Sequence, residues 1–457
     1  MLSLMLWGLL APSVQAVALI KGNGTFEQQC SSFASSLRIP GANTTYAEYI
    51  PAGSTLQFPS ADSSCGRSSQ NVTANLCRVT ARIATSVRSG IKFEAWLPED
   101  WTGRFLSTGN GGLGVYEDLD YATSLGFAAV ATNNGHDGMS GASFLNNPDV
   151  IEDFTYRALT TGVVVGKDVA KSFYNKPHTK SYYLGCSTGG RQGFKQAQAF
   201  PDNFDGIVAG APAFAFNNLT SWSCHFLPLT GQQGADTFIP MSMWPTIHDD
   251  ILNQCDELDG AKDGFLESPD LCDYKPESLL CGVASNQTDS CLTQKQVETL
   301  RGIYSPLIDA SGDLVYPRMQ PGAEITGAPQ TYFNGQPFGA ADWFKYAIYN
   351  DSNWDPATIT SEDYVRSSSL NLFNIETWDG DLSPFQQSGG KILHYHGLVD
   401  GTISSDNSPR YYEHVSQTMG KTPAELDEFY RFFRISGLAH CSGGTGADEN
   451  NWECVAN

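Results

Sequence analysis

The chain has 457 residues, of which 41% are hydrophobic and 12% aromatic, a composition typical of a globular protein with a sizeable core. This length exceeds what one compact core usually needs, so we expect a core joined by a second domain or a large insertion. The net charge of −22 and the pI of about 4.6 argue against nucleic acid as a partner, because phosphate binding needs clustered Lys and Arg.

Residues 1–16 are predicted to form a signal peptide. They are mainly apolar and end at Val14-Gln15-Ala16, a small-x-small pattern typical of a signal-peptidase site. A short buried helix is the alternative interpretation. The run is too short to span a bilayer and no second one follows, so we expect no membrane partner.

Sequons and cysteines also favour export to an oxidising compartment. The chain contains 11 Cys, too many for free thiols in a secreted protein, and the odd count leaves at least one unpaired within the chain. Six Asn-x-Ser/Thr sequons are candidate glycosylation sites. They are at Asn23, Asn43, Asn71, Asn218, Asn286 and Asn350. We therefore predict a secreted, extracellular protein.

Periodicity predicts a parallel α/β sheet. Residues 17–80 are rich in Ser, Thr and Gly and show little helical periodicity. Beyond them, strands and helices alternate at a spacing typical of parallel sheets. The predicted strands are 79–84, 91–97, 104–108, 126–132, 180–185 and 206–211, and the predicted helices are 156–174 and 191–200.

The alternation stops near Pro212 and resumes at Lys391. The intervening residues 213–389 are rich in Trp and Pro and contain four Cys between 255 and 291. We interpret them as a lid domain inserted between two late strands. The core then comprises residues 17–212 and 390–457, with its last strands at 391–397 and 430–435.

A Gly185-x-Ser187-x-Gly189 motif lies between a predicted strand and a predicted helix. In that context the motif is typical of the nucleophile elbow, in which small residues let the backbone turn sharply and expose the Ser side chain. The sequence therefore predicts an α/β-hydrolase core with a parallel sheet, a large lid-domain insertion, and Ser187 as the nucleophile.

A Ser hydroxyl needs a base to take its proton, and this fold places an acid and then a His after the Ser. Asp400 and His440 follow the last two predicted strands, at the sheet edge where such sites form. The alternatives are Asp379, Asp381 and Asp406 for the acid, none of which directly follows a core strand. Among the other histidines, His394 and His396 are expected to be core or strand-end groups, and His136 is a loop residue that can lie near the site.

Cysteines flank both candidate residues. Cys186 precedes Ser187, and Cys441 follows His440. If Ser187 and His440 are hydrogen-bonded, the two cysteines are within disulfide range. We predict that a Cys186–Cys441 bridge joins the elbow to the loop that carries the base.

These motifs resemble those of the tannase and fungal feruloyl esterase family, and type B-like feruloyl esterases most. The resemblance extends from about Cys30 to the end of the chain and includes a Cys-Ser, Asp, His-Cys pattern in which the two Cys form a disulfide. It rests on Gly185-Cys186-Ser187-Thr188-Gly189-Gly190-Arg191-Gln192-Gly193, Gly109-Asn110-Gly111-Gly112, His396-Gly397-Leu398-Val399-Asp400 and Gly437-Leu438-Ala439-His440-Cys441-Ser442-Gly443-Gly444.

An acidic loop at residues 256–265 is the candidate calcium site. Calcium prefers carboxylate and carbonyl oxygens, which Asp256, Asp259, Asp263, Ala261 and Phe265 can supply. From the pattern alone a solvated acidic loop fits equally well. The resemblance implies a structural Ca²⁺ here, since the family's lid carries calcium at this motif.

The resemblance also bears on the remaining cysteines. Cys255 and Cys272 flank the acidic loop and are expected to bridge and stiffen it. Cys30, Cys77, Cys281 and Cys291 are likewise expected in disulfides, whereas Cys65, Cys224 and Cys454 have no assigned partner.

The predicted reaction is ester hydrolysis without an organic cofactor. The backbone N–H of Thr188 and one from Gly111 or Gly112 are predicted to hold the oxyanion. By resemblance, the substrates are feruloyl and other hydroxycinnamoyl esters of plant cell-wall polysaccharide, and gallate esters are the alternative. A binding protein with an inactive hydrolase fold and a peptidase on the same scaffold are the alternatives from other classes.

Overall fold

The computed structural model describes residues 24–445 except 114, 117–118, 265 and 283–290. The predicted signal peptide, the sequons at Asn23 and Asn286, the candidate ligand Phe265, and Cys454 lie outside the described residues. Within the described part of the chain, no helix combines the length and apolarity needed to cross a membrane.

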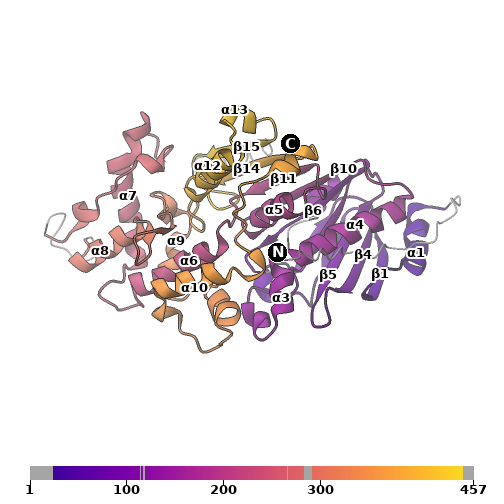
Figure 1. The fold of residues 1–457 in the computed structure, drawn as a ribbon, viewed down its shortest axis with the longest axis horizontal. Helices are drawn as coiled ribbons and strands as arrows, with labels where there is room; N and C mark the ends of the chain where they lie inside the picture. Colours follow the sequence, from indigo (N-terminus) through magenta and orange to yellow (C-terminus); the bar gives the residue numbers. More distant parts are fainter. Residues whose placement is uncertain (1–23, 114, 117–118, 265, 283–290, 446–457) are drawn as a thin grey trace, which may run out of the picture.

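A nine-stranded sheet forms the core (Figure 1). From β9 to β15 all neighbouring strands are parallel, which confirms the predicted fold class. The other end of the sheet is antiparallel, because β5 pairs antiparallel with β9 and with β4, and β4 pairs antiparallel with β1. In sheet order the strands are β1 (Ala42–Ile50), β4 (Leu76–Ala84), β5 (Gly90–Pro98), β9 (Phe127–Thr132), β6 (Arg104–Thr108), β10 (Lys180–Cys186), β11 (Gly206–Gly210), β14 (Lys391–Gly397) and β15 (Tyr430–Ile435).

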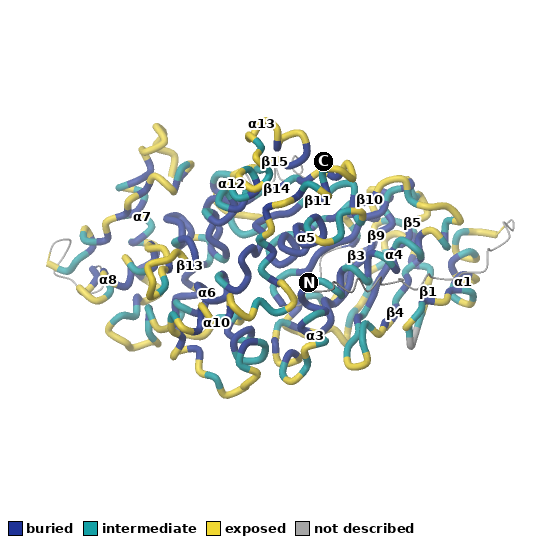
Figure 2. Tube along the Cα trace, viewed as in Figure 1, coloured by how far each residue is buried: buried dark blue, intermediate teal, exposed yellow. Residues whose placement is uncertain are grey.

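Several helices share one large apolar cluster with the sheet (Figure 2). Val163, Phe194 and Tyr411 are buried members of this cluster. A smaller cluster, which includes Leu76 and Trp96, contains Ala122 of α2 (Asp120–Ser124). The longer of these helices are α1 (Phe26–Ser36), α4 (Ala158–Tyr174), α5 (Thr188–Ala199) and α12 (Asn407–Met419), and the short α13 (Pro423–Leu426) contributes Leu426.

Helix α1 corrects the interpretation of residues 17–80 as poor in helix periodicity. Thr25 and Gln28 form a reciprocal capping box, which satisfies two otherwise unpaired N–H groups at the helix start. Cys30 and Phe33 are fully buried, and Cys30 bridges to Cys77 on β4. This helix is therefore defined by its N-terminal cap and its tertiary contacts. It has no long apolar stripe that the sequence pattern could reveal.

The chain leaves the sheet after β11 and returns at β14, the strand beside it. Most of the residues between them pack around a second apolar cluster, whose members include Trp222, Trp244 and Trp343. Phe144 and Phe154 of the core also belong to this cluster, so it continues into the core. In Figure 1 most of these elements, from α6 to α10, lie to the left of the sheet. The helices are α6 (Phe216–Thr230), α7 (Trp244–Cys255), α8 (Gln294–Ile303), α9 (Ala328–Tyr332), α10 (Ser361–Leu370) and α11 (Ser383–Gln387).

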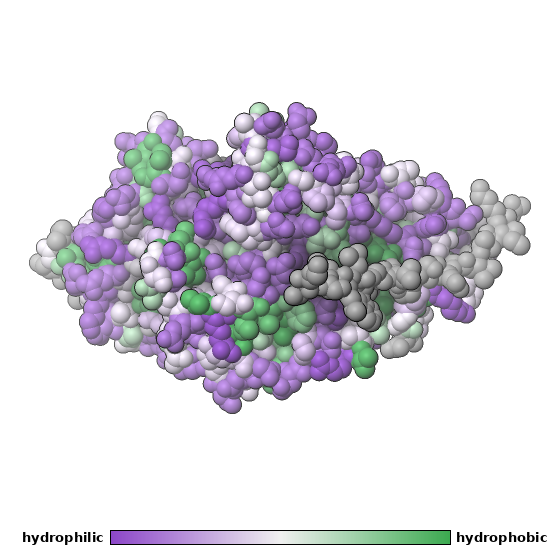
Figure 3. All heavy atoms as spheres, viewed as in Figure 1, coloured by the Kyte–Doolittle hydropathy of each residue, from purple (hydrophilic) through white to green (hydrophobic). Residues whose placement is uncertain are grey.

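The structure pairs the eight cysteines that were predicted to form disulfides. Cys224 is a buried thiol, and burial raises its pKa. The face of the molecule in Figure 3 is mainly hydrophilic, as expected for a chain with a net charge of −22. The bridges are Cys30–Cys77, Cys186–Cys441, Cys255–Cys272 and Cys281–Cys291.

Candidate active site

Ser187 lies between the end of β10 and the first residue of α5. Its backbone has φ 64° and ψ −122°, a conformation that costs a non-glycine residue about 1–3 kcal/mol. Its N–H donates to Gly210 O at 3.0 Å, and its carbonyl accepts from Arg191 N at 3.1 Å. The surrounding backbone therefore holds Ser187 in the strained turn predicted for a nucleophile.

Gly185 in the motif and Gly190 directly after it permit this turn because backbone approaches backbone there. A Cβ at Gly185 would lie 2.9 Å from Gly189 C, and one at Gly190 would lie 2.3 Å from Gly210 O. Neither contact can be relieved by moving a flexible side chain. The spacing of small residues in the motif is thus a packing requirement.

Arg191 anchors the helix that follows Ser187. It is fully buried, and its guanidinium donates to Thr155 O at 3.0 Å and Phe154 O at 3.3 Å. Both carbonyls belong to the π-helical turn Asp153–Arg157 that leads into α4. Burial lowers the pKa of Arg191 to about 10. The side chain therefore joins α5 to the start of α4.

Gln192 holds the glycine-rich loop against the elbow. Its side-chain amide donates to Asn110 Oδ1 at 3.1 Å and to Asn134 Oδ1 at 2.9 Å, and its carbonyl oxygen accepts from Asn110 N at 3.0 Å. The N–H groups of Gly111 and Gly112 follow this fixed point in the chain. Thr188 is the first residue of α5, so its N–H has no partner in the preceding turn. Thr188, Gly111 and Gly112 remain the predicted oxyanion donors.

Asp400 is fully buried and accepts four hydrogen bonds. Oδ1 accepts from Thr402 N at 2.7 Å and Ile403 N at 2.9 Å. Oδ2 lies 2.8 Å from His440 Nδ1 and 3.1 Å from His396 Nε2. The structure therefore brings together the predicted acid and base.

The charges of this pair stabilise each other. Burial raises the pKa of Asp400, but the charge of His440 and the hydrogen bonds from His396 and His440 lower it further, so the net pKa is well below its ordinary value. Burial lowers the pKa of His440, but the charge of Asp400 and their hydrogen bond outweigh it, so the net pKa is raised. Asp400 is thus an anion under ordinary conditions and favours an imidazolium at His440.

The Cys186–Cys441 disulfide brings the elbow to the loop of His440. The two Cα atoms are 5.8 Å apart, although 255 positions separate them in sequence. Ser187 directly follows Cys186 in the sequence, and His440 directly precedes Cys441. Within the described residues no hydrogen bond joins the Ser187 hydroxyl to His440; such contacts often tighten only when substrate is bound.

The insertion packs against the turn that contains Asp400. Tyr332 OH donates to Thr402 O at 2.6 Å, and Ser404 Oγ donates to Arg318 O at 2.6 Å. The same turn thus supplies the carboxylate of the site and the contact surface for the insertion.

The other candidate acids and bases occupy different environments. Asp379 and Asp381 are exposed, and neither is bonded to His440. His136 is buried between the rings of Phe144 and Phe154. His394 and His396 are buried in β14, as expected for strand histidines, but His396 also contacts Asp400. The contact between His396 and Asp400 was not predicted from the sequence. The only sign of it there is the spacing of four residues between the two.

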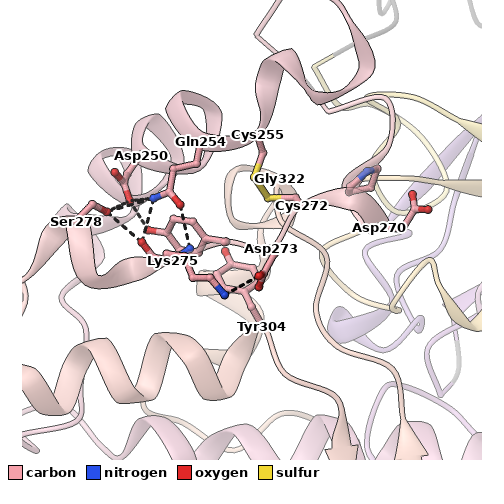
Figure 4. Close-up of a disulfide and its surroundings, with 12 residues drawn as sticks. Asp250, Gln254, Cys255, Asp270, Cys272, Asp273, Lys275, Ser278, Tyr304 and Gly322 are labelled. Atoms are coloured by element: carbon pink, nitrogen blue, oxygen red, sulfur yellow. Dashed lines mark hydrogen bonds and ion pairs between the residues drawn. A yellow bond between two sulfur atoms is a disulfide. The ribbon is translucent and has the colours of Figure 1, made fainter.

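The acidic loop follows α7 and is flanked by the Cys255–Cys272 bridge (Figure 4). Asp256 is buried and accepts from Gly264 N at 3.3 Å, and Asp259 accepts from Ala261 N at 2.9 Å and Glu267 N at 3.1 Å. In the part of the chain that the structure describes, no three His, Cys, Asp or Glu side chains converge on one point. The carboxylates are directed at backbone N–H groups in this arrangement, and calcium binding stays a prediction.

Three predicted glycosylation sites have described side chains. Asn71 and Asn350 are exposed and Asn218 is half-buried. Asn218 Oδ1 accepts from Ser368 Oγ at 2.6 Å. Asn43 lies in β1, but its side chain is outside the described part. Glycan attachment at the six sequons stays a prediction.

Comparisons with known proteins show the family of this chain. The family described as "Tannase and feruloyl esterase" matches residues 77–456. A probable feruloyl esterase B-2 of Aspergillus terreus is 53% identical over 426 residues, which cover 92% of this chain and 80% of the relative.

Solved structures agree as well. The crystal structure of feruloyl esterase B from Aspergillus oryzae has a TM-score of 0.89 at 51% identity, covering 92% of this chain and 84% of the other. The tannin acyl hydrolase from Aspergillus niger has a TM-score of 0.71 at 25% identity, covering 88% of this chain and 80% of the other. The chain belongs to the tannase and feruloyl esterase family.

Proposed function

We propose that this protein is a serine carboxylesterase that hydrolyses feruloyl esters. The observation that carries the proposal is that the Cys186–Cys441 bridge joins the residue before Ser187 to the residue after His440, whose Nδ1 lies 2.8 Å from Asp400 Oδ2. Similarity to proteins named feruloyl esterase B, at about 50% identity over most of the chain, supports the acyl specificity.

In the proposed mechanism the Ser187 hydroxyl attacks the ester carbonyl while His440 Nε2 takes its proton. Asp400 holds Nδ1–H and stabilises the imidazolium. The N–H groups of Thr188 and of Gly111 or Gly112 stabilise the oxyanion. His440 then protonates the departing alkoxide, which leaves a feruloyl ester on Ser187.

The second half of the reaction repeats these roles with water. His440 takes a proton from water, the hydroxide attacks the acyl carbonyl, and the proton returns to Ser187 as ferulic acid leaves. The chain's own groups supply every proton transfer.

The finer parts of the proposal concern the natural substrate and the place of action. We assign the leaving group to plant cell-wall polysaccharide and the enzyme to the extracellular space. Four disulfides are typical of proteins from oxidising compartments and support the second assignment.

Gallate ester hydrolysis is the second candidate, and similarity to a tannin acyl hydrolase favours it. That similarity, at 25% identity, is weaker than the 51% to feruloyl esterase B. Initial rates on methyl ferulate, propyl gallate and a peptide anilide test the proposal. We expect methyl ferulate to have the highest kcat/KM. Higher kcat/KM on propyl gallate would reassign the acyl group, activity on the anilide would indicate a peptidase, and no turnover would indicate a binding protein.

A further inference from the structure

A chain of buried polar groups runs from β15 to the Asp400 carboxylate. The Tyr430 hydroxyl lies 2.8 Å from His394 Nδ1, and His394 Nε2 lies 2.9 Å from Ser408 Oγ. Ser408 Oγ lies 2.6 Å from His396 Nδ1, and His396 Nε2 lies 3.1 Å from Asp400 Oδ2. Three elements contribute: β14, the first turn of α12, and β15.

All five side chains have no exposed surface. The rings of Phe194, Phe214 and Phe432 surround His394. Because water has no access, each donor must find its acceptor within the chain of groups. This requirement makes the proton positions deducible for neutral imidazoles.

The deduction starts at His396. Its Nε2 faces two acceptors, Asp400 Oδ2 and Ile403 O, so Nε2 carries the proton. Nδ1 of a neutral ring must then accept, which makes Ser408 the donor.

The remaining protons follow in turn. The single hydroxyl proton of Ser408 is already donated to His396 Nδ1. In the contact with His394, Ser408 Oγ must therefore accept, and His394 Nε2 donates. His394 Nδ1 then accepts from the Tyr430 hydroxyl. Every donor in the chain therefore points toward Asp400.

The electrostatic environment agrees with neutral groups at the far end. Burial lowers the pKa of His394 well below its ordinary value. Burial raises the pKa of Tyr430. Neither group ionises near neutral pH, so the donor order is stable there.

We propose that His396 is a positioning residue for the triad, holding Asp400 Oδ2 with Nε2–H while Ser408 fixes its tautomer. This inference rests on the catalytic roles proposed for Ser187, Asp400 and His440. Two donors on Oδ2 and two on Oδ1 leave the carboxylate no alternative rotamer with equal bonding. Sharing Oδ2 also spreads its charge, so that His440 experiences less of it.

Two substitutions separate hydrogen bonding from packing. Gln at position 396 can present one N–H to Asp400 and one carbonyl oxygen to Ser408, as the neutral imidazole does. Leu can do neither. For folded His396→Leu, we expect kcat on methyl ferulate to fall by about tenfold to a hundredfold. His396→Gln should recover most of this loss.

The pH profile of kcat/KM gives a readout that packing alone does not move. Removing the His396 donor leaves the Asp400 charge more available to His440, which raises the pKa of His440. The acid limb of His396→Leu should therefore lie at higher pH than that of the wild type, and His396→Gln should restore it. The other titratable groups that interact with Asp400 are Tyr316 and Tyr332, which are buried with raised pKa values and stay neutral.

Ser408→Ala provides a milder test if His396→Leu does not fold. It should lower kcat and move the acid limb in the same direction, by less. Ser405→Ala is the matched control, because Ser405 is also buried but bonds Leu398 O instead; it should behave as wild type.

Three results overturn the inference: a folded His396→Leu enzyme with wild-type kcat and acid limb, a His396→Gln enzyme as impaired as His396→Leu, or Ser408→Ala that matches Ser405→Ala. If Ser187→Ala is inactive, any of these results refutes the role of His396 and leaves the proposed function standing. Retained activity in Ser187→Ala would instead overturn the proposed function.

Discussion

Cys186 and Cys441 form a disulfide that joins the residue before Ser187 to the residue after His440. In the sequence, one segment precedes the insertion and the other follows it. Cys441 has φ 65°, a left-handed conformation that is uncommon for a residue other than Gly. The bridge therefore holds a strained loop at the point where the base must meet the nucleophile.

Removing this bridge should impair catalysis more than folding. For Cys186→Ala with Cys441→Ala, we expect a folded enzyme with kcat lowered by about a hundredfold, since a displacement of about 1 Å at the base has that effect. The loss of unfolding free energy should be about 2–4 kcal/mol. Methyl ferulate kinetics and denaturant titration measure the two quantities.

Cys281→Ala with Cys291→Ala is the matched control, because it removes a bridge within the insertion and should leave kcat unchanged. If the Cys186/Cys441 variant keeps wild-type kinetics, with both cysteines confirmed absent by mass spectrometry, packing alone holds the triad.

The triad should behave as one unit. Ser187→Ala and His440→Ala should each lower kcat by at least about a thousandfold, and the double variant should be little worse than either, because each loss disables the same step. Single-turnover and steady-state rates on methyl ferulate measure this. A single variant that retains a tenth of wild-type kcat would remove that residue from the proposed mechanism.

Much of the core could be predicted from local pattern. Strands 104–108, 391–397 and 430–435 have the predicted bounds, because each is a short β-rich run with clear ends. The Cys186–Cys441 bridge, which the structure contains, was predicted because its cysteines lie next to Ser187 and His440, the residues that the motif and the strand order indicated as nucleophile and base. In these places local sequence and tertiary structure agree.

The missed features depend on contacts that a linear pattern does not contain. Helix α1 forms through its cap and the Cys30–Cys77 bridge. Helix α5 begins at Thr188, not at the predicted Arg191, because Ser187 is both the residue of the elbow and the N-cap of the helix. His396 resembled an ordinary core residue, since its partner Ser408 lies on another element. Much of the insertion is short helical turns with no strong periodicity.

Calcium, if it binds at residues 256–265, should stabilise the protein and leave ester chemistry unchanged. A ligand that binds only the folded state adds about 2.7 kcal/mol at a hundred times its Kd. We expect added Ca²⁺ to raise Tm and a chelator to lower it. The Ca²⁺-dependent part of Tm should vanish in Asp256→Ala and Asp263→Ala.

Glu257→Ala is the control within the same loop, because its side chain is 72% exposed and is not a predicted ligand. Calorimetric titration with CaCl₂ gives an independent reading. Equal Ca²⁺ binding by wild type and by Asp256→Ala would place any site elsewhere.

Asp400→Asn should change both the height and the position of the pH–rate profile. The amide keeps the size of the side chain but removes the charge that raises the pKa of His440. Since the reaction needs neutral His440, the acid limb of kcat/KM should move to lower pH. The plateau should still fall by orders of magnitude, because an amide also disturbs the His440 tautomer.

Stability provides an independent check with a defined sign. Asp400 has a pKa well below its ordinary value in the folded state, so the unfolded chain binds its proton first as pH falls. Its contribution to the free energy of unfolding is therefore present above the unfolded pKa of about 3.9 and declines below it. Asp400→Asn lacks that term, so the difference in Tm between wild type and Asp400→Asn should shrink as the pH falls below about 4. A difference that grows as pH falls below about 4 would mean that the carboxylate is protonated more readily in the folded protein than in the unfolded chain, and that its hydrogen bonds do not favour the anion.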